Sequence, residues 1–500
     1  MTDPGGALDV SERPGRARTA RYAGLAGATL LAVAGWLGGA LPDAPATTPV
    51  GIWRGPHGPL VLGCWLVGTV LLVGAWWALR RGVPSTRWAY LTAGLWLLPL
   101  LAAPPVGSRD VYSYVCQGWS WAHGADPYRV GVATAGCPWT EAVSPIWRDT
   151  PAPYGPFFVL LAGLAVALGG GLVGAIVLLR VLALAGVLLA ALCLPGLARA
   201  VGVPTGRAAW LALACPLVGV HLVAGAHNDA LLLGLLLLGL LVLVRRPGKP
   251  RALVVAGVLL GLAVAVKAVA VVVFPFAALA AVLGRYTPRA LLRDAAWLAG
   301  GVAVALLGTS LVTGLGFGWV GGLARSGDSE QWTSPPTAVG FVVDYAGALV
   351  GREPHAVPVA RLVALLVLAV LIVVLWWWAW SALRRLSDVR QRAARLAAAR
   401  PRVALTGAGL ALAATALLAP VFHPWYATWP LAVLAAATVP VARTAWFVLP
   451  CAVVSFLALP DGTNLARFTK APGAIAMTAL VLALGVWAVR VALARHARKT

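Results

Sequence analysis

Residues 229–245 read DALLLGLLLLGLLVLVR, an apolar run that begins at an acidic residue and ends at a basic one. Apolar runs of roughly 20 residues, the length that a membrane helix needs, recur along the chain. The chain has 500 residues, of which 60% are hydrophobic and only 11% are charged. A soluble domain would be about half apolar and about a quarter charged. The sequence therefore predicts an all-α, polytopic transmembrane protein.

The apolar runs predict about fourteen membrane helices, with about twelve as the lower bound. The expected spans are 22–41, 59–79, 88–106, 171–195, 208–226, 229–245, 251–267, 268–284, 294–313, 357–380, 402–421, 425–442, 444–460 and 472–492. Lys267 interrupts the pair 251–284, which otherwise reads as one long run. The run 156–169 is also apolar, but a full crossing there would invert every later loop. We therefore expect a short re-entrant or interfacial element at 156–169.

The distribution of charge predicts the orientation in the membrane. The net charge is +23, and the basic residues cluster in short connections such as Arg80-Arg81 and Arg245-Arg246. Such clusters are typical of cytoplasmic loops, so the charge favours a membrane-lipid environment over nucleic acid as a partner. We expect a multi-pass plasma-membrane protein with both termini in the cytoplasm and its carboxylate-bearing loops outside.

This topology divides the chain into six segments. They are a cytoplasmic tail 1–21, two transmembrane helices in 22–86, a core 87–313 that contains the first large outer loop 107–170, a second outer loop 314–356, the C-terminal transmembrane helices in 357–492 and a cytoplasmic tail 493–500. The sequence contains no P-loop and no convincing GxGxxG after a strand, so a soluble nucleotide-binding domain is not expected.

The first outer loop opens with the polar stretch 107–127, GSRDVYSYVCQGWSWAHGADP, in an otherwise apolar region. Asp110 lies just past the third expected helix. A partly buried carboxylate at that position has a raised pKa and can accept the proton of an attacking hydroxyl. The alternative is an interfacial residue that pairs with Arg109 or caps the next helix. The residues alone leave both interpretations open.

Three other polar groups lie at expected outer ends of helices. His227-Asn228-Asp229 separates two apolar runs; these side chains would be costly in lipid, so they face a cavity or cap the next helix. Lys267 either snorkels to the interface or binds an anion. His423 could donate to a phosphate or a sugar hydroxyl, whereas the aromatic residues after it are also typical of an interfacial belt.

The candidate substrate- and phosphate-binding residues are the polar and aromatic side chains at these outer positions. They are Arg109, Tyr112, Tyr114, Gln117, Asp126, Tyr154, His227, Asn228, Asp229, Lys267, Arg325, Trp332, Ser334, His423, Trp425 and Tyr426. The seven histidines are scattered, and no HxxxH or CxxC occurs. No cofactor is therefore expected, and a divalent cation held by two outer carboxylates is a minor alternative.

Cys116 and Cys137 share the first outer loop. An oxidising exterior would permit a disulfide between them. Sequence spacing alone does not establish the required geometry, so the pairing stays open at this point.

Six short sequence motifs occur in order within about residues 85–460. They are SRDVYSYVCQG (108–118), GADPY (124–128), APYGP (152–156), GAHNDALLLG (225–234), WTSPPTAVG (332–340) and HPWYATWP (423–430). Together they resemble the actinobacterial polyprenol-phosphate-mannose-dependent α-1,6-mannosyltransferases, the MptB-like proteins, which belong to the GT-C class of membrane glycosyltransferases. The resemblance implies a GT-C catalytic core in 87–313 and an extracytoplasmic active site. It also implies a polyprenyl-phosphate-mannose donor and a lipid-anchored α-1,6-mannan acceptor of lipomannan or lipoarabinomannan type.

In the GT-C class an aspartate near the start of the first large outer loop is the usual candidate base, and Asp110 matches that position. The resemblance implies an inverting displacement of a β-linked mannosyl phosphate by an acceptor 6-hydroxyl, so one base suffices. Lys267, His423 or an outer arginine would then stabilise the phosphate. Two alternatives remain: a GT-C transferase that uses another prenyl-phosphate sugar, and a polytopic transporter or lipid-carrier flippase.

Overall fold

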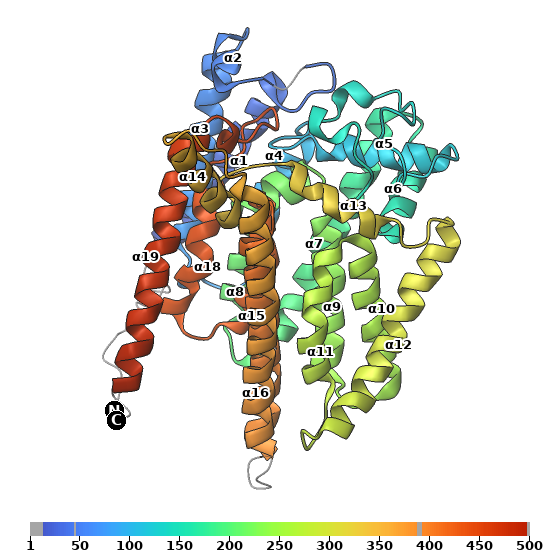
Figure 1. The fold of residues 1–500 in the computed structure, drawn as a ribbon, viewed down its shortest axis with the longest axis vertical. Helices are drawn as coiled ribbons and strands as arrows, with labels where there is room; N and C mark the ends of the chain where they lie inside the picture. The colour runs from blue at the N-terminus through green and yellow to red at the C-terminus, as the bar shows by residue number, and fades with distance from the viewer. Residues whose placement is uncertain (1–13, 45–46, 388–392, 498–500) are drawn as a thin grey trace.

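The computed structural model describes residues 14–44, 47–387 and 393–497. Within these ranges the chain forms helices and loops, with no strand and a single isolated bridge between Ala458 and Asn464. The all-α class is therefore confirmed. Figure 1 shows the long helices side by side in an elongated bundle. The parts of the two expected tails at 1–13 and 498–500 lie outside the described residues.

Among the described residues, seven helices are long and apolar enough to cross a membrane. They are α1 (Pro14–Gly38), α3 (Gly58–Ala78), α7 (Leu172–Val201), α12 (Pro288–Thr313), α15 (Ala356–Ser387), α16 (Ala393–Leu418) and α19 (Lys470–Ala497). The pair α8 (Thr205–Leu213) and η4 (Val218–Ala224), bent by 62°, would make an eighth span. The protein is therefore a multi-pass membrane protein.

The expected count of about fourteen spans is higher because it included shorter helices. These are α4 (Thr86–Ala102), α9 (Asp229–Arg245), α10 (Pro250–Val266), η5 (Ala268–Val273) with α11 (Phe274–Ala281), η8 (Pro424–Ala427) with α17 (Thr428–Ala437), and α18 (Val441–Val454). A helix of 17 residues, such as α9 or α10, is only about 25 Å long. A bilayer core is roughly 30 Å thick, so these helices are shorter than a full crossing.

Two of the expected spans are interrupted, each for an identifiable reason. Pro216 lies three residues beyond the end of α8; it lacks the amide hydrogen that a continuous helix would use there, and its ring disfavours a helical backbone at Cys215. Lys267 is extended, with φ −155° and ψ 127°, between α10 and η5. The interruption at Lys267 that the sequence indicated is therefore present, and it places the lysine side chain at a helix end.

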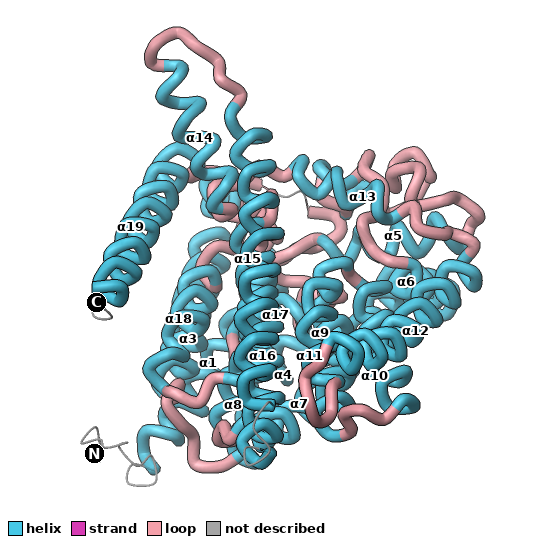
Figure 2. Tube along the Cα trace, turned by 60° about the horizontal axis from the view of Figure 1, so that its bottom comes forward, coloured by secondary structure: helices cyan, strands magenta, loops and turns pink. Residues whose placement is uncertain are grey.

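The polar loops meet at one end of the bundle, here called the loop end, which carries α2 (Pro49–Arg54), α5 (Asp110–Ala122), α13 (Trp319–Arg325) and α14 (Pro335–Ala348) (Figure 1). The Gly107 amide donates to the Pro460 carbonyl over 3.1 Å. Figure 2 shows α5, α6 and α13 on one side of this end and α14 with α19 on the other. The segments predicted as the first and the second outer loop therefore lie at the same end of the bundle.

The apolar run 156–169 forms a helix of its own, α6 (Pro156–Gly169), with 14 residues. Such a helix is about 21 Å long, too short for the hydrocarbon core. It packs tightly on α5, because a Cβ added at Gly118 would come within 2.4 Å of the Ala162 backbone. The expected short, non-crossing element is consistent with this length.

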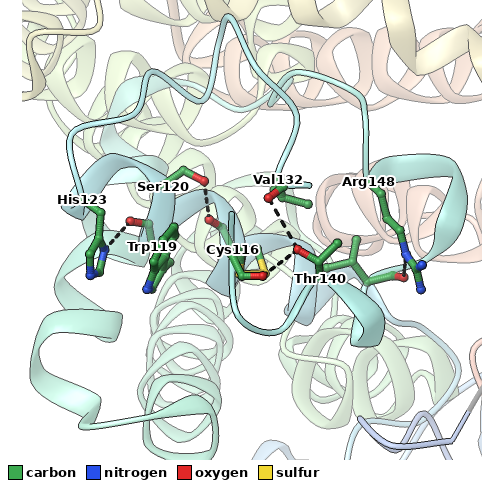
Figure 3. Close-up of a disulfide and its surroundings, with 9 residues drawn as sticks. Cys116, Trp119, Ser120, His123, Val132, Thr140 and Arg148 are labelled. Atoms are coloured by element: carbon green, nitrogen blue, oxygen red, sulfur yellow. Dashed lines mark hydrogen bonds between the residues drawn. A yellow bond between two sulfur atoms is a disulfide. The ribbon is translucent and has the colours of Figure 1, made fainter. Parts of the chain in front are cut away.

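Figure 3 shows the disulfide that joins Cys116 in α5 to Cys137 in the loop that follows. The Thr140 hydroxyl donates to the Cys137 carbonyl over 2.7 Å, and the Ser120 hydroxyl donates to the Cys116 carbonyl over 2.8 Å. The pairing that spacing left open is therefore formed. It holds the loop after α5 against the helix that begins at Asp110.

Candidate active site

Asp110 is the first residue of α5, and its side chain is 18% exposed. The N-cap position is taken by Arg109, so the Asp110 carboxylate is not the helix cap that the alternative interpretation required. Gly107, at φ +74°, makes the turn before α5 in the left-handed region that favours glycine. The Asp110 amide donates to the Ser108 hydroxyl over 3.1 Å. These local constraints fix the start of the helix and leave the carboxylate available.

Two cavities meet at Asp110. The larger has a volume of about 300 Å³ and the smaller about 60 Å³. Asp110, Trp147, His423 and Trp425 line both of them. The larger cavity is otherwise walled mainly by the loops 328–331 and 458–470, whereas the smaller one is lined by Ser113, Gln117, Tyr154, Lys267, Arg325 and Tyr426. A carboxylate at this junction can contact molecules that enter from either side.

The electrostatic surroundings of Asp110 suit proton transfer near neutral pH. Burial raises the pKa of its carboxyl to about 6, an effect that Lys267 opposes and the negative charge of Asp229 reinforces. A base works best when its pKa lies close to the working pH. Asp110 is therefore ionised at pH 7 and basic enough to accept a proton.

Beside Asp110 lies a buried ion pair between the start of α9 and the end of α10. Both carboxylate oxygens of Asp229 accept hydrogen bonds from the Lys267 ammonium at 2.9 Å. The Trp429 indole N–H also donates to Asp229. Asp229 is fully buried and does not line either cavity, whereas Lys267 is 13% exposed and lines the smaller one. Asp229 therefore contacts Lys267 and does not reach either cavity.

His227 lies between the two carboxylates. Its Nδ1 is 3.8 Å from Asp110, 3.9 Å from Asp229 and 3.3 Å from the Tyr114 hydroxyl. Its ring packs on Trp425 with the centroids 4.1 Å apart. His227 and Asp229 therefore lie beside Asp110, but neither they nor Asn228 face these two cavities, although one interpretation required it. Asn228 takes the N-cap position of α9, as the other interpretation allowed, although its side chain makes no capping hydrogen bond.

His423 and Trp425 form a stacked wall between the two cavities. Their rings are parallel, with centroids 4.6 Å apart. Burial, reinforced by the charge of Lys267, lowers the pKa of His423 to about 3. His423 is therefore neutral, and it can exchange a hydrogen bond with a sugar hydroxyl but does not supply a positive charge to a phosphate.

Arg109 is not paired with Asp110. Its guanidinium donates to the carbonyls of Ala44, Ala142 and Asp461, and its side chain is buried. These carbonyls belong to three loops that are far apart in sequence. Arg109 borders the larger cavity. Its hydrogen bonds hold the three loops together.

Several other predicted residues lie away from both cavities and have structural contacts instead. The Tyr112 hydroxyl donates to the Ala40 carbonyl, Asp126 pairs with the neighbouring Arg129, the Trp332 indole donates to Thr469 and the Ser334 hydroxyl donates to the Ala419 carbonyl. Tyr114 and Asn228 are also buried outside the cavity walls. Gln117, Tyr154, Arg325 and Tyr426 do line the smaller cavity, as expected.

Sequence reasoning missed the residues that the C-terminal loop supplies. Asn464, Arg467 and Lys470 line the larger cavity, and the Asn464 amide donates to Gln331 of the 328–331 loop over 2.9 Å. The signal available was the polar run Asp461-Gly462-Thr463-Asn464 between two apolar segments. It has the same form as His227-Asn228-Asp229, which was singled out.

Residues 14–44, 47–387 and 393–497 contain no group of three or more His, Cys, Asp or Glu side chains that could hold a metal ion. Asp110 and Asp229 are both near Lys267 and His227, so their charges have protein partners.

Known proteins were compared with the chain as a whole. Residues 21–283 match the family model described as alpha-(1->6)-mannopyranosyltransferase, N-terminal domain, and residues 336–487 match the MptB C-terminal domain. The chain belongs to the alpha-(1->6)-mannopyranosyltransferase MptA/MptB family. It is therefore a glycosyltransferase with alpha-(1->6)-mannosyltransferase activity, as the sequence motifs implied.

Curated relatives agree with this family membership. An alpha-(1->6)-mannopyranosyltransferase of Mycobacterium tuberculosis is 33% identical over 446 residues, which cover 78% of this chain and 72% of the relative. Alpha-(1->6)-mannopyranosyltransferase A of the same organism is 35% identical over 387 residues, covering 74% of this chain and 69% of the relative. Alpha-(1->6)-mannopyranosyltransferase B of Corynebacterium glutamicum is 27% identical over 459 residues, covering 85% and 74%. No solved structure gives a significant match.

The buried pair predicts that a single substitution destabilises the protein more than a double substitution that removes both charges. Removing one partner leaves a buried charge without compensation, so Asp229→Asn lowers the free energy of unfolding by about 3 kcal/mol. The double variant Asp229→Leu with Lys267→Met removes both charges and regains most of that loss. Tryptophan fluorescence during denaturation of the purified enzyme measures both. Glu141→Gln, at a side chain that is 87% exposed, is the control. A double variant less stable than Asp229→Asn would contradict the pairing argument.

Proposed function

We propose that this mannosyltransferase takes mannose from a polyprenyl-phosphate donor and adds it to the 6-hydroxyl of a lipid-anchored α-1,6-mannan at an active site outside the plasma membrane. The observation that carries the proposal is Asp110, a partly buried carboxylate with a pKa of about 6 at the junction of two cavities. An inverting transferase needs one base within hydrogen-bond reach of the acceptor hydroxyl, at the place where the acceptor meets the donor sugar. The residues around Asp110 satisfy that requirement.

The placement of the site supports a membrane-borne donor. Asp110 is the first residue of α5 at the loop end of the bundle, where the headgroup of a lipid carrier would be accessible to it. Cys116, one partner of the disulfide Cys116–Cys137, lies six residues after Asp110 in the sequence. Disulfides persist in oxidising compartments outside the cytoplasm. The basic short connections, which the sequence predicts to be cytoplasmic, agree with the same orientation.

The proposed reaction is a single inverting displacement of GT-C type. The acceptor 6-hydroxyl attacks C1 of a β-linked mannosyl phosphate while its proton passes to the Asp110 carboxylate. The bond from C1 to the phosphate oxygen breaks, and the phosphate leaves with the bonding electrons. Since phosphate is already a good leaving group, the protein acts mainly by positioning the two substrates and stabilising charge.

The alternatives fit the site less well. The matched family favours mannose over another prenyl-linked sugar. A flippase would need polar groups along the whole membrane depth, whereas Asp110, His227, Asp229, Lys267 and His423 all gather at the loop end.

Purified enzyme in lipid nanodiscs, supplied with radiolabelled polyprenyl-phosphate-mannose and an α-1,6-mannan primer, should elongate the primer with α-linked mannose. The same preparation should transfer little or no sugar from polyprenyl-phosphate-glucose or polyprenyl-phosphate-arabinose. The products are separated by chromatography and identified by an α-mannosidase digest. Movement of the lipid across a vesicle bilayer without any transfer would instead support the flippase.

Asp110→Asn should lower kcat by about 10²- to 10⁴-fold, because general-base assistance is worth that much. The substitution keeps the size of the side chain, so expression and thermal stability should be unchanged. Glu141→Gln removes an exposed carboxylate from the same loop and should retain full activity. Near-normal transfer by Asp110→Asn would remove Asp110 from the base role.

The rate should depend on pH through Asp110. The base must be ionised, so kcat/KM should be flat above about pH 7 and fall tenfold per unit below the pKa of about 6. Rates measured with saturating primer from pH 4.5 to pH 8 test this dependence. The residual activity of Asp110→Asn should not fall in the same way at low pH. A wild-type profile without a break between roughly pH 5 and pH 7 would count against the assignment.

A further inference from the structure

Five cationic side chains line the two cavities, but three of them are already engaged. Arg109 donates to three carbonyls, Lys267 is held by Asp229 at 2.9 Å, and Arg325 pairs with Asp328 at 2.8 Å. The two that remain are Arg467 and Lys470. Within the described part of the chain their side chains have no ion-pair or hydrogen-bond partner, although Lys470 lies 5.5 Å from the ring centroid of Phe341.

Both free cations stand on a segment with two different faces, here called the two-faced hairpin (456–470). The Leu465 amide donates to the Leu457 carbonyl, and the Leu459 amide donates to the Thr463 carbonyl, so the segment folds back on itself. Arg467 follows this turn in the short helix η9 (Leu465–Arg467), and Lys470 is the first residue of α19. The segment has one side toward α3 and α18 and another toward the larger cavity.

One face of the two-faced hairpin borders a shallow, open apolar groove of about 520 Å³. The groove is lined by Val73, Ala452, Val453, Phe456, Leu457, Leu465 and Thr469. It lies against α3 and α18, so it is open along the apolar side of the bundle. A groove with this lining suits a hydrocarbon chain in contact with the membrane.

The other face lines the larger cavity with Ala458, Gly462, Asn464, Arg467 and Lys470. Neighbouring residues of the hairpin, such as Leu465 and Asn464, thus belong to the groove and to the cavity respectively. The apolar groove, the two free cations and the cavity that contains Asp110 are therefore joined by one short segment.

We propose that Arg467 and Lys470 bind the phosphate of the prenyl-linked donor, with its hydrocarbon chain in the apolar groove and its mannosyl group in the larger cavity beside Asp110. This assignment rests on the proposed function, since it presupposes a lipid-phosphate donor. The carboxylates on the same cavity wall do not cancel the two cations, because Asp328 pairs with Arg325 and Glu330 lies 3.9 Å from Arg361.

The charge requirement of the reaction agrees with this arrangement. The donor phosphate carries one negative charge while it is esterified to mannose and gains a second as it leaves. Two cations without competing carboxylates stabilise that increase more than cations already paired would. Their exposure also means that substitution leaves no buried group without a partner, so variants should fold.

The test uses Arg467→Gln, Lys470→Gln and the double variant in nanodiscs. Two constants report on the donor site: KM for polyprenyl-phosphate-mannose and Ki for polyprenyl phosphate, which acts as a competing inhibitor. Each single change should raise both constants by about tenfold, and the double variant should raise them by about a hundredfold. KM for the mannan primer should change by less than about twofold. The conservative variants Arg467→Lys and Lys470→Arg should retain most of the affinity.

Phe456→Ala tests the groove separately. It should raise Ki for polyprenyl phosphate several-fold and leave Ki for a short-chain citronellyl phosphate unchanged, because only the long chain reaches the groove. Arg129→Gln, at a side chain 85% exposed in the first outer loop, is the matched control for loss of a surface cation and should leave all constants unchanged.

Two results would overturn this assignment while leaving the proposed function intact. In the first result, the double variant keeps KM for the donor and Ki for polyprenyl phosphate within about twofold of the wild-type values, while Lys267→Gln or Arg325→Gln raises both constants. The phosphate would then bind in the smaller cavity. In the second, only KM for the primer rises, which places the acceptor's lipid at the hairpin. Failure of the wild-type enzyme to use any prenyl-phosphate donor is a different result, because it refutes the proposed function itself.

Discussion

The site depends on one interaction, the buried ion pair between Asp229 and Lys267. A fully buried carboxylate is too costly unless a cation and hydrogen bonds compensate it. Lys267 supplies the cation because α10 ends there in an extended residue, and the Trp429 indole supplies a further hydrogen bond. The pair therefore joins the start of α9, the end of α10 and the 424–437 segment. That junction places His227, His423 and Trp425 around Asp110.

A second junction closes the site from the other side. The Arg109 guanidinium donates to carbonyls of three separate loops, and the Asp461 carboxylate accepts from the Thr47 amide, the Thr463 amide and the Thr463 hydroxyl. Buried backbone carbonyls need such partners, so these hydrogen bonds determine where the loops meet. Because Asp110 follows Arg109 directly, the residue that joins the loops also positions the base. The wall of the larger cavity and the base are thus set by adjacent residues.

Much of the helical framework could be predicted, because apolar runs and helix breakers are local signals. The run 229–245 became α9 with the same limits, and the break expected at Lys267 is present. The site was only partly predictable, because a polar residue at a helix end looks alike whether it faces a cavity or forms a turn. Asp110 and Asp126 both belong to the polar stretch 107–127, yet one lines both cavities and the other pairs with Arg129. The approach of residues 461–470 to Asp110 crosses some 350 positions of sequence, and spacing carries no information about such a contact.

The division of positive charge in the site follows from the needs of a single base. A free cation next to Asp110 would hold the pKa of its carboxyl low and make it a poor proton acceptor. Lys267 does have this lowering effect, but the negative charge of Asp229, to which Lys267 is paired, acts in the opposite direction, and burial keeps the pKa of Asp110 near 6. A leaving phosphate, by contrast, requires cations without carboxylate partners. In the proposed binding mode, Arg467 and Lys470 meet that requirement on the hairpin wall of the larger cavity. Separating the paired cation near the base from the unpaired cations at the cavity wall lets one compact site satisfy both demands.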